Sequence, residues 1–145
     1  MSTSTEVSDT REQDRGCPPV AIALLCIAFA LALFTALVPT GEHLSDEAWN
    51  AHQKFHAFRE IFLVSLFSIT GIALCLGPLR TGRPNALPAV GLLGVGVVAG
   101  FWVGLPFTGI GKSGIEPFVN HGLQVITLVV GYGIARSHAR SRSRP

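Results

Sequence analysis

Four long apolar stretches decide what this chain can fold into. They cover approximately residues 20–38, 56–76, 87–107 and 118–135. A helix rises 1.5 Å per residue, so each stretch is about long enough to cross the hydrocarbon core of a bilayer. Three of the four contain no Asp, Glu, Lys or Arg, and the second carries only Arg59 and Glu60 near its start. We therefore expect an all-α integral membrane protein built as a four-helix bundle.

The composition agrees with a membrane protein that has no separate soluble domain. Hydrophobic residues make up 48% of the 145 residues and charged residues 14%, against about 25% charged in soluble domains. We expect residues 18–135 to form one transmembrane domain in the cell membrane, crossing it several times. The expected partners are membrane lipids and a lipophilic small molecule, and no nucleic acid.

The two ends of the chain are polar. Residues 1–17 are rich in Ser, Thr and charge, and predict a disordered tail, whereas residues 136–145 predict a basic tail. A cleaved signal peptide is the competing interpretation of the first apolar stretch, residues 20–38. The polar segment before it is long for a signal peptide, and so is the apolar stretch itself, so we expect it to be retained. Three cysteines show no CxxC pair or metal-ligand spacing, which argues against a thiol-redox enzyme.

Arginines predict the orientation. With four spans, one side of the membrane receives Arg11, Arg15, Arg80, Arg83 and the C-terminal cluster. The other side receives only Lys54, Arg59 and Lys112. Because cytoplasmic loops carry the excess of Lys and Arg, both termini are expected in the cytoplasm (N-in/C-in).

Residues 42–60 are the most informative polar segment. Ser45 is the expected N-cap of a helix, with Asp46 and Glu47 in its first turn. This helix is expected to begin outside the membrane and to run directly into the second span.

Two polar stripes lie at the same, outer end of the bundle. The first consists of Trp49, His52, His56 and Glu60, and the second of Glu116, Asn120, His121, Gln124 and Thr127. Residues three or four apart share a helix face, and polar groups at this depth turn toward the bundle interior. We expect the stripes to face each other across a cavity. The alternative is that Trp49, Lys54, Arg59 and the acidic residues before them are interfacial anchors.

Acid–base catalysis on a lipophilic substrate is the leading interpretation of these stripes. Burial raises the pKa of a carboxyl group, so Glu60 would be the proton donor, with His56 or His121 accepting or relaying the proton. The remaining polar and aromatic residues would contact the substrate: Trp49, Arg59, Trp102, Asn120 and Gln124. This chemistry requires no cofactor.

Other interpretations stay open. His52 and His56, with His121 or Glu60 as the third ligand, would form a site for a divalent metal, and His56 with His121 would hold haem b. A purely structural partner is a third interpretation. Its support is a face of Gly96, Gly100 and Gly104, which lets helices approach closely within the bundle or in a homo-oligomer.

The motif W-x-x-H-x-K-F-H, running from Trp49 to His56, resembles a loose group of small four-span membrane proteins. By size and layout the chain is also similar to small integral-membrane terpene cyclases. That resemblance implies proton-initiated cyclisation or isomerisation of an isoprenoid. It implies the acid role for Glu60, with Glu116 as the second choice.

Overall fold

The described part of the chain is entirely helical in its regular structure. The computed structural model describes residues 16–83, 85–108 and 115–143, so most of the predicted N-terminal tail lies outside the described residues. Its elements are α2 (Pro19–Leu37), α3 (Pro39–Ser45), α4 (Ala51–Leu74), the π-helix η1 (Cys75–Leu79), α5 (Ala86–Thr108) and α6 (Glu116–Arg142). Four of these segments are long and apolar enough to cross a membrane: Pro19–Leu37, Ala51–Leu79, Ala86–Val103 and Phe118–Arg142. The predicted multi-pass four-helix bundle is confirmed.

The start of the helix that leads into the second span was predicted wrongly. Ser45 does not cap this helix: it ends α3, where its hydroxyl donates to the Glu42 carbonyl at 2.8 Å. Helix α4 begins at Ala51, and Asn50 and Gln53 cap it reciprocally through 3.0 Å and 2.9 Å hydrogen bonds. This capping box satisfies two backbone N–H groups at once, an advantage that a lone serine lacks.

Two helices continue beyond the predicted ends of their spans. Helix α4 does not stop at residue 76, because the chain continues as η1 through Gly77 and Pro78. A π-turn widens the backbone and is a common place for a helix to absorb an irregularity. Helix α6 continues past residue 135 to Arg142, so the basic segment prolongs the last span as a helix.

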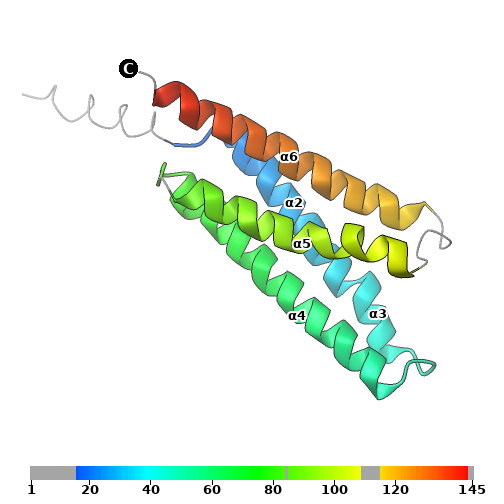
Figure 1. Cartoon of the computed structure of the whole chain (residues 1–145). Coiled ribbons are helices and arrows are strands. Elements are labelled where there is room, and N and C mark those ends of the chain that lie inside the picture. The colour runs from blue at the N-terminus through cyan, green and yellow to red at the C-terminus, as the bar shows by residue number, and fades with distance from the viewer. Residues whose placement is uncertain (1–15, 84, 109–114, 144–145) are drawn as a thin grey trace, which may run out of the picture.

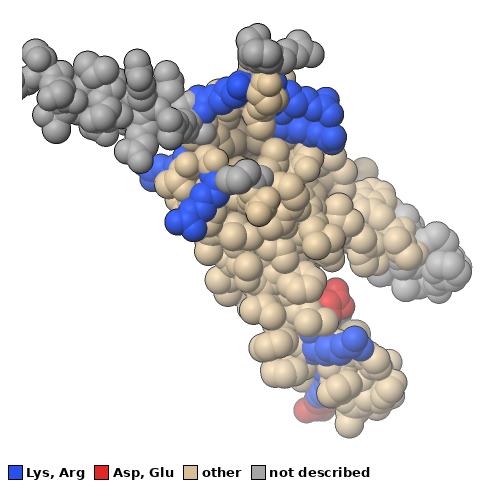
Figure 2. Space-filling model, turned by 60° about the vertical axis from the view of Figure 1, so that its left-hand side comes forward, with Lys and Arg blue, Asp and Glu red and all other residues tan. Residues whose placement is uncertain are grey.

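The four long helices have an unequal arrangement. Helix α2 packs against both α4 and α6, and α5 packs against the same two helices (Figure 1). Helices α2 and α5 also touch, whereas α4 and α6 form the wide diagonal of the bundle. Toward the α3 end, α4 diverges from α5 and α6 (Figure 1), and Figure 2 shows the described residues separating there into two arms.

The two ends differ in their charges. The arginine end carries Arg80, Arg83, Arg136, Arg140 and Arg142, and these basic residues gather at one end of the molecule in Figure 2. The histidine end carries His52 and His56 on α4 and His121 on α6. By the positive-inside rule, the arginine end is the expected cytoplasmic one.

Close helix contacts are made where glycines meet large side chains. At Gly71 of α4, an added Cβ would collide with the Phe29 ring of α2, and at Gly94 of α5 with the Leu128 side chain of α6. Of the predicted glycine face, Gly96 approaches Phe67 and Gly100 has open space within 4 Å, while the surroundings of Gly104 are not described. The bundle therefore uses other glycines for its closest helix contacts.

Candidate functional site at the histidine end

A polar network joins α2 and α6 inside the bundle. Its centre is Thr35 of α2, whose hydroxyl donates to the Leu31 carbonyl at 2.8 Å. Two amides of α6 donate to the Thr35 oxygen: Asn120 through Nδ2, and Gln124 through Nε2 at 3.1 Å. Gln124 is fully buried, and a buried amide in a membrane bundle is costly unless it is hydrogen-bonded.

The direction of these hydrogen bonds favours one tautomer of His121. Thr35 donates its only hydroxyl proton to Leu31, so Gln124 must turn its NH₂ group toward Thr35. The Gln124 Oε1 atom then faces the Nδ1 atom of His121 at 3.3 Å. A carbonyl oxygen only accepts, so Nδ1 carries the hydrogen. In the neutral imidazole, Nε2 is therefore left as a proton acceptor.

Aromatic rings enclose one face of this imidazole. The His121 ring stacks on Phe101 of α5, with centroids 3.8 Å apart and planes 18° from parallel. Phe101 in turn contacts Trp102 and Phe118 edge-to-face, at centroid distances of 5.3 Å and 5.8 Å. Trp102 remains 40% exposed. The result is an aromatic cluster beside a potential base, open on one side.

A second polar group lies along α4. The Nε2 atoms of His52 and His56 are 3.2 Å apart, and their rings meet edge-to-face at 4.5 Å. Glu60 follows one turn later, and all three side chains are exposed. The buried face of α4 begins at the neighbouring Ala57, which is about 100° around the helix from His56.

The structure brings together only part of the predicted site. Asn120, His121 and Gln124 share one network, and His52 pairs with His56. Within the described residues, no hydrogen bond or ring contact links the α4 group to the α6 group. The side chain of Glu116 is not described, and its predicted place in the second stripe lies outside the described side chains.

The remaining predicted residues lie at the edge of this site. Trp49 is half-buried and its backbone N–H donates to the Asp46 carbonyl at 3.3 Å, whereas the Arg59 side chain is exposed. Among the residues that the structure describes, no three His, Cys, Asp or Glu side chains converge as metal ligands. The predicted set of His52, His56 and His121 is thus not assembled here.

Two residues of the site, Thr35 and Phe101, were not predicted from the sequence. Thr35 is the only hydroxyl residue in the first apolar stretch, and a lone polar group inside a span is a signal that could have identified it. Phe101 carried no such signal, because nine phenylalanines are spread through the chain and only the helix arrangement selects one of them.

Comparison of the chain with protein families, with curated protein sequences and with solved structures found no match. The four-span layout thus stands on the helices themselves.

Proposed function

We propose that this protein is a membrane-embedded enzyme that moves a proton on a lipophilic substrate. The most plausible reaction is the isomerisation or acid-initiated cyclisation of an isoprenoid. The observation that supports it is the position of the His121 imidazole, with Nδ1 at 3.3 Å from Gln124 Oε1 and the ring stacked on Phe101; from this we infer that Nε2 is the free acceptor. A base next to aromatic ring faces suits chemistry that passes through a carbocation.

The proposed reaction conserves the proton. A carboxyl group, assigned to Glu60, adds a proton to a carbon–carbon double bond and leaves a carbocation on the substrate. The faces of Phe101 and Trp102 stabilise that charge. His121 Nε2 then removes a proton from a neighbouring carbon, which forms the new double bond. The proton returns from His121 to Glu60 through water at the histidine end.

The support differs between the two catalytic groups. For the base, it is the hydrogen-bond network that runs from Thr35 through Gln124 to His121. For the acid, it is the place of Glu60 on the same α4 face as His52 and His56, together with the resemblance in layout to small membrane terpene cyclases. The separation of α4 from α5 and α6 at this end leaves room for a substrate to enter from the bilayer (Figure 2).

Deuterium incorporation tests this proposal without knowledge of the product. Membranes containing the protein are incubated in D₂O with a panel of acyclic isoprenoids, and deuterium on carbon is measured by mass spectrometry. His121→Ala should lower the incorporation rate by about 10²–10⁴-fold, the usual contribution of a general base. Leu123→Ala, an exposed neighbour on α6, is the matched control. Equal rates in both variants would refute the role of His121.

The acid is tested in the same assay. Glu60→Gln keeps the shape of the side chain but cannot donate an acidic proton, and it should lower incorporation by about 10²-fold or more. Glu47→Gln removes an exposed carboxylate before α4 begins and should have no effect. If only His121→Ala is impaired, the acid is a different group.

The His52–His56 pair favours a second candidate function, binding of a divalent metal. Tetrahedral zinc with Zn–N bonds of about 2.0–2.1 Å places two ligand nitrogens about 3.3 Å apart, close to the observed 3.2 Å. Zinc titration by calorimetry should then show binding that His52→Ala abolishes and that His121→Ala leaves intact. No binding by the unaltered protein would eliminate this candidate.

A further inference from the structure

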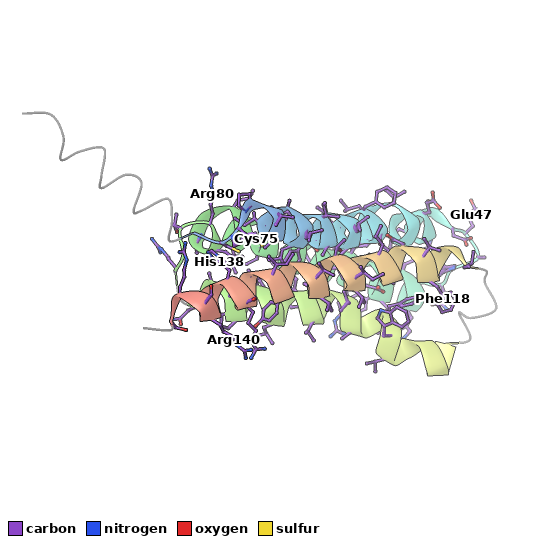
Figure 3. The ribbon with its side chains drawn as sticks, turned by 90° about the horizontal axis from the view of Figure 1, so that it is seen from above. Glu47, Cys75, Arg80, Phe118, His138 and Arg140 are labelled. Atoms are coloured by element: carbon purple, nitrogen blue, oxygen red, sulfur yellow. The ribbon has the colours of Figure 1, made fainter. Side chains whose placement is uncertain are left out.

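The arginine end contains a cavity that the proposed reaction does not use. Its volume is about 490 Å³, and it lies between the start of α2, the turn after η1, and the last turns of α6. Figure 3 shows this end with Arg80, His138 and Arg140 labelled. The lining includes three arginines, Arg83, Arg136 and Arg142, and none of the residues lining it is acidic.

The cavity lining combines apolar and cationic side chains. Leu79, Leu87 and Tyr132 line it, and each belongs to a membrane-spanning segment. The three arginines come from the turn before α5 and from the end of α6. A ligand here would meet cationic groups at the membrane boundary and hydrocarbon surface directly beside them.

One lining residue has a ring nitrogen without a hydrogen-bond partner among the described residues. The Nε2 atom of His138 is buried and has no partner among the described residues, and His138 lines the cavity. Buried polar atoms in proteins are nearly always hydrogen-bonded. This nitrogen is itself inaccessible, so an anionic oxygen in the cavity would instead pair with the guanidinium groups of Arg83, Arg136 and Arg142.

We propose that this cavity binds the phosphate headgroup of an anionic phospholipid. Arginines bind phosphate oxygens through their planar forks, and basic pockets between spans on the cytoplasmic side suit such headgroups. The apolar wall of Leu79, Leu87 and Tyr132 would accompany the first part of the acyl chains. A free phosphate shares the cationic contacts but would leave that wall uncovered.

The test titrates the purified full-length protein in a neutral detergent with short-chain phosphatidylglycerol, and follows binding by calorimetry. Short-chain phosphatidylcholine and inorganic phosphate are the comparison probes. We expect phosphatidylglycerol to bind more tightly than both. Equal affinity for phosphatidylcholine would overturn the proposal, and equal affinity for inorganic phosphate would overturn the assignment to a lipid.

Matched double variants separate the cavity from general surface charge. Arg136→Ala with Arg142→Ala removes two lining arginines, whereas Arg80→Ala with Arg140→Ala removes two exposed arginines of the same end that do not line the cavity. At about five-fold per arginine near a membrane surface, the first pair should weaken phosphatidylglycerol binding by about 25-fold. The second should change it by less than about two-fold. Equal losses in the two pairs would overturn the proposal.

A second readout uses the half-buried Cys17, which also lines the cavity. Bound phosphatidylglycerol should slow alkylation of Cys17 by a water-soluble maleimide, measured by peptide mass spectrometry. Phosphatidylcholine should leave that rate unchanged. Unchanged labelling with a lipid that calorimetry shows to be bound would place the binding site elsewhere and overturn the proposal.

Discussion

The arginine end and the histidine end of this bundle differ in how their helices contact each other. Toward the arginine end, α2 and α4 meet through small residues, with Gly71 against the Phe29 ring and Cys75 fully buried. Toward the histidine end, α4 diverges, and the buried contact between α2 and α6 is polar, with Gln124 bonded to Thr35. One end therefore supplies the packing that stabilises the bundle, and the other holds oriented polar groups.

The largest expected effect tests the packed region. Gly71→Ala places a Cβ against the Phe29 ring, a rigid group that cannot turn aside, so unfolding should require about 1–3 kcal/mol less free energy. Gly100→Ala, where the added Cβ has open space, should be neutral or slightly stabilising. Denaturant unfolding in mixed micelles measures both. A Gly71→Ala variant as stable as Gly100→Ala would show that this contact is loose.

The middle of the bundle offers a smaller effect of opposite sign. The Ser68 hydroxyl is fully buried on α4 and has no hydrogen-bond partner among the described residues. Ser68→Ala removes this unsatisfied group and should stabilise the protein by about 1 kcal/mol in the same unfolding assay. Thr127→Val removes a hydroxyl bonded to the Leu123 carbonyl at 2.8 Å and should not stabilise. A destabilised Ser68→Ala variant would contradict this difference.

A change at the start of α4, at the histidine end, should affect only the nearby part of the helix. Asn50→Ala removes the N-cap of α4 and half of its capping box, at a cost of roughly 0.5–1 kcal/mol. Hydrogen exchange should accelerate in the first turn of α4, while the Phe29–Gly71 contact region stays protected. Ser45→Ala, at the residue first predicted to cap this helix, should leave exchange in α4 unchanged. Faster exchange throughout the bundle would mean that the two ends are not independent.

The sequence could predict features that arise within one helix, but not those that depend on contacts between helices. The spans follow from apolar length alone, and the shared face of His52 and His56 follows from helical spacing. The start of α4 was missed because Ser45 and Asn50 are both residue types that favour the N-cap position, and the reciprocal bonds of Asn50 and Gln53 are seen only in the structure. The spacing of residues along a helix also does not show which neighbouring helix a given face packs against. That depends on which glycines are in close contact, here Gly71 and Gly94.

The same distinction applies to the candidate site: its residues on one helix were predictable, and their partners on other helices were not. The stripe of Asn120, His121 and Gln124 was visible in the sequence, because polar residues inside a span are rare. Its partner was not, since the sequence pattern pointed to α4 across the bundle, whereas the structure joins these residues to Thr35 of α2 and Phe101 of α5. His52, His56 and Glu60 of the first stripe instead remain exposed on α4.

The smallest expected effect is a shift in reactivity at the arginine end. Burial raises the pKa of the Cys17 thiol above its ordinary value, and only the thiolate reacts with alkylating agents. The alkylation rate of Cys17 should therefore be slower at neutral pH than that of a free cysteine. The pH at which this rate reaches half of its maximum should also be higher than for a free cysteine. Measurement across a pH series by peptide mass spectrometry checks this, and a midpoint at or below that of free cysteine would contradict the burial.

The hydrogen-bond chain from Leu31 through Thr35 and Gln124 to His121 is tested most directly by ¹⁵N nuclear magnetic resonance of the imidazole. At a pH where His121 is neutral, the ring ¹⁵N shifts should identify Nδ1 as the protonated nitrogen and Nε2 as the bare one. Gln124→Leu should abolish this preference. A neutral His121 that carries its hydrogen on Nε2 in the unaltered protein would contradict the chain and remove the base from the proposed reaction.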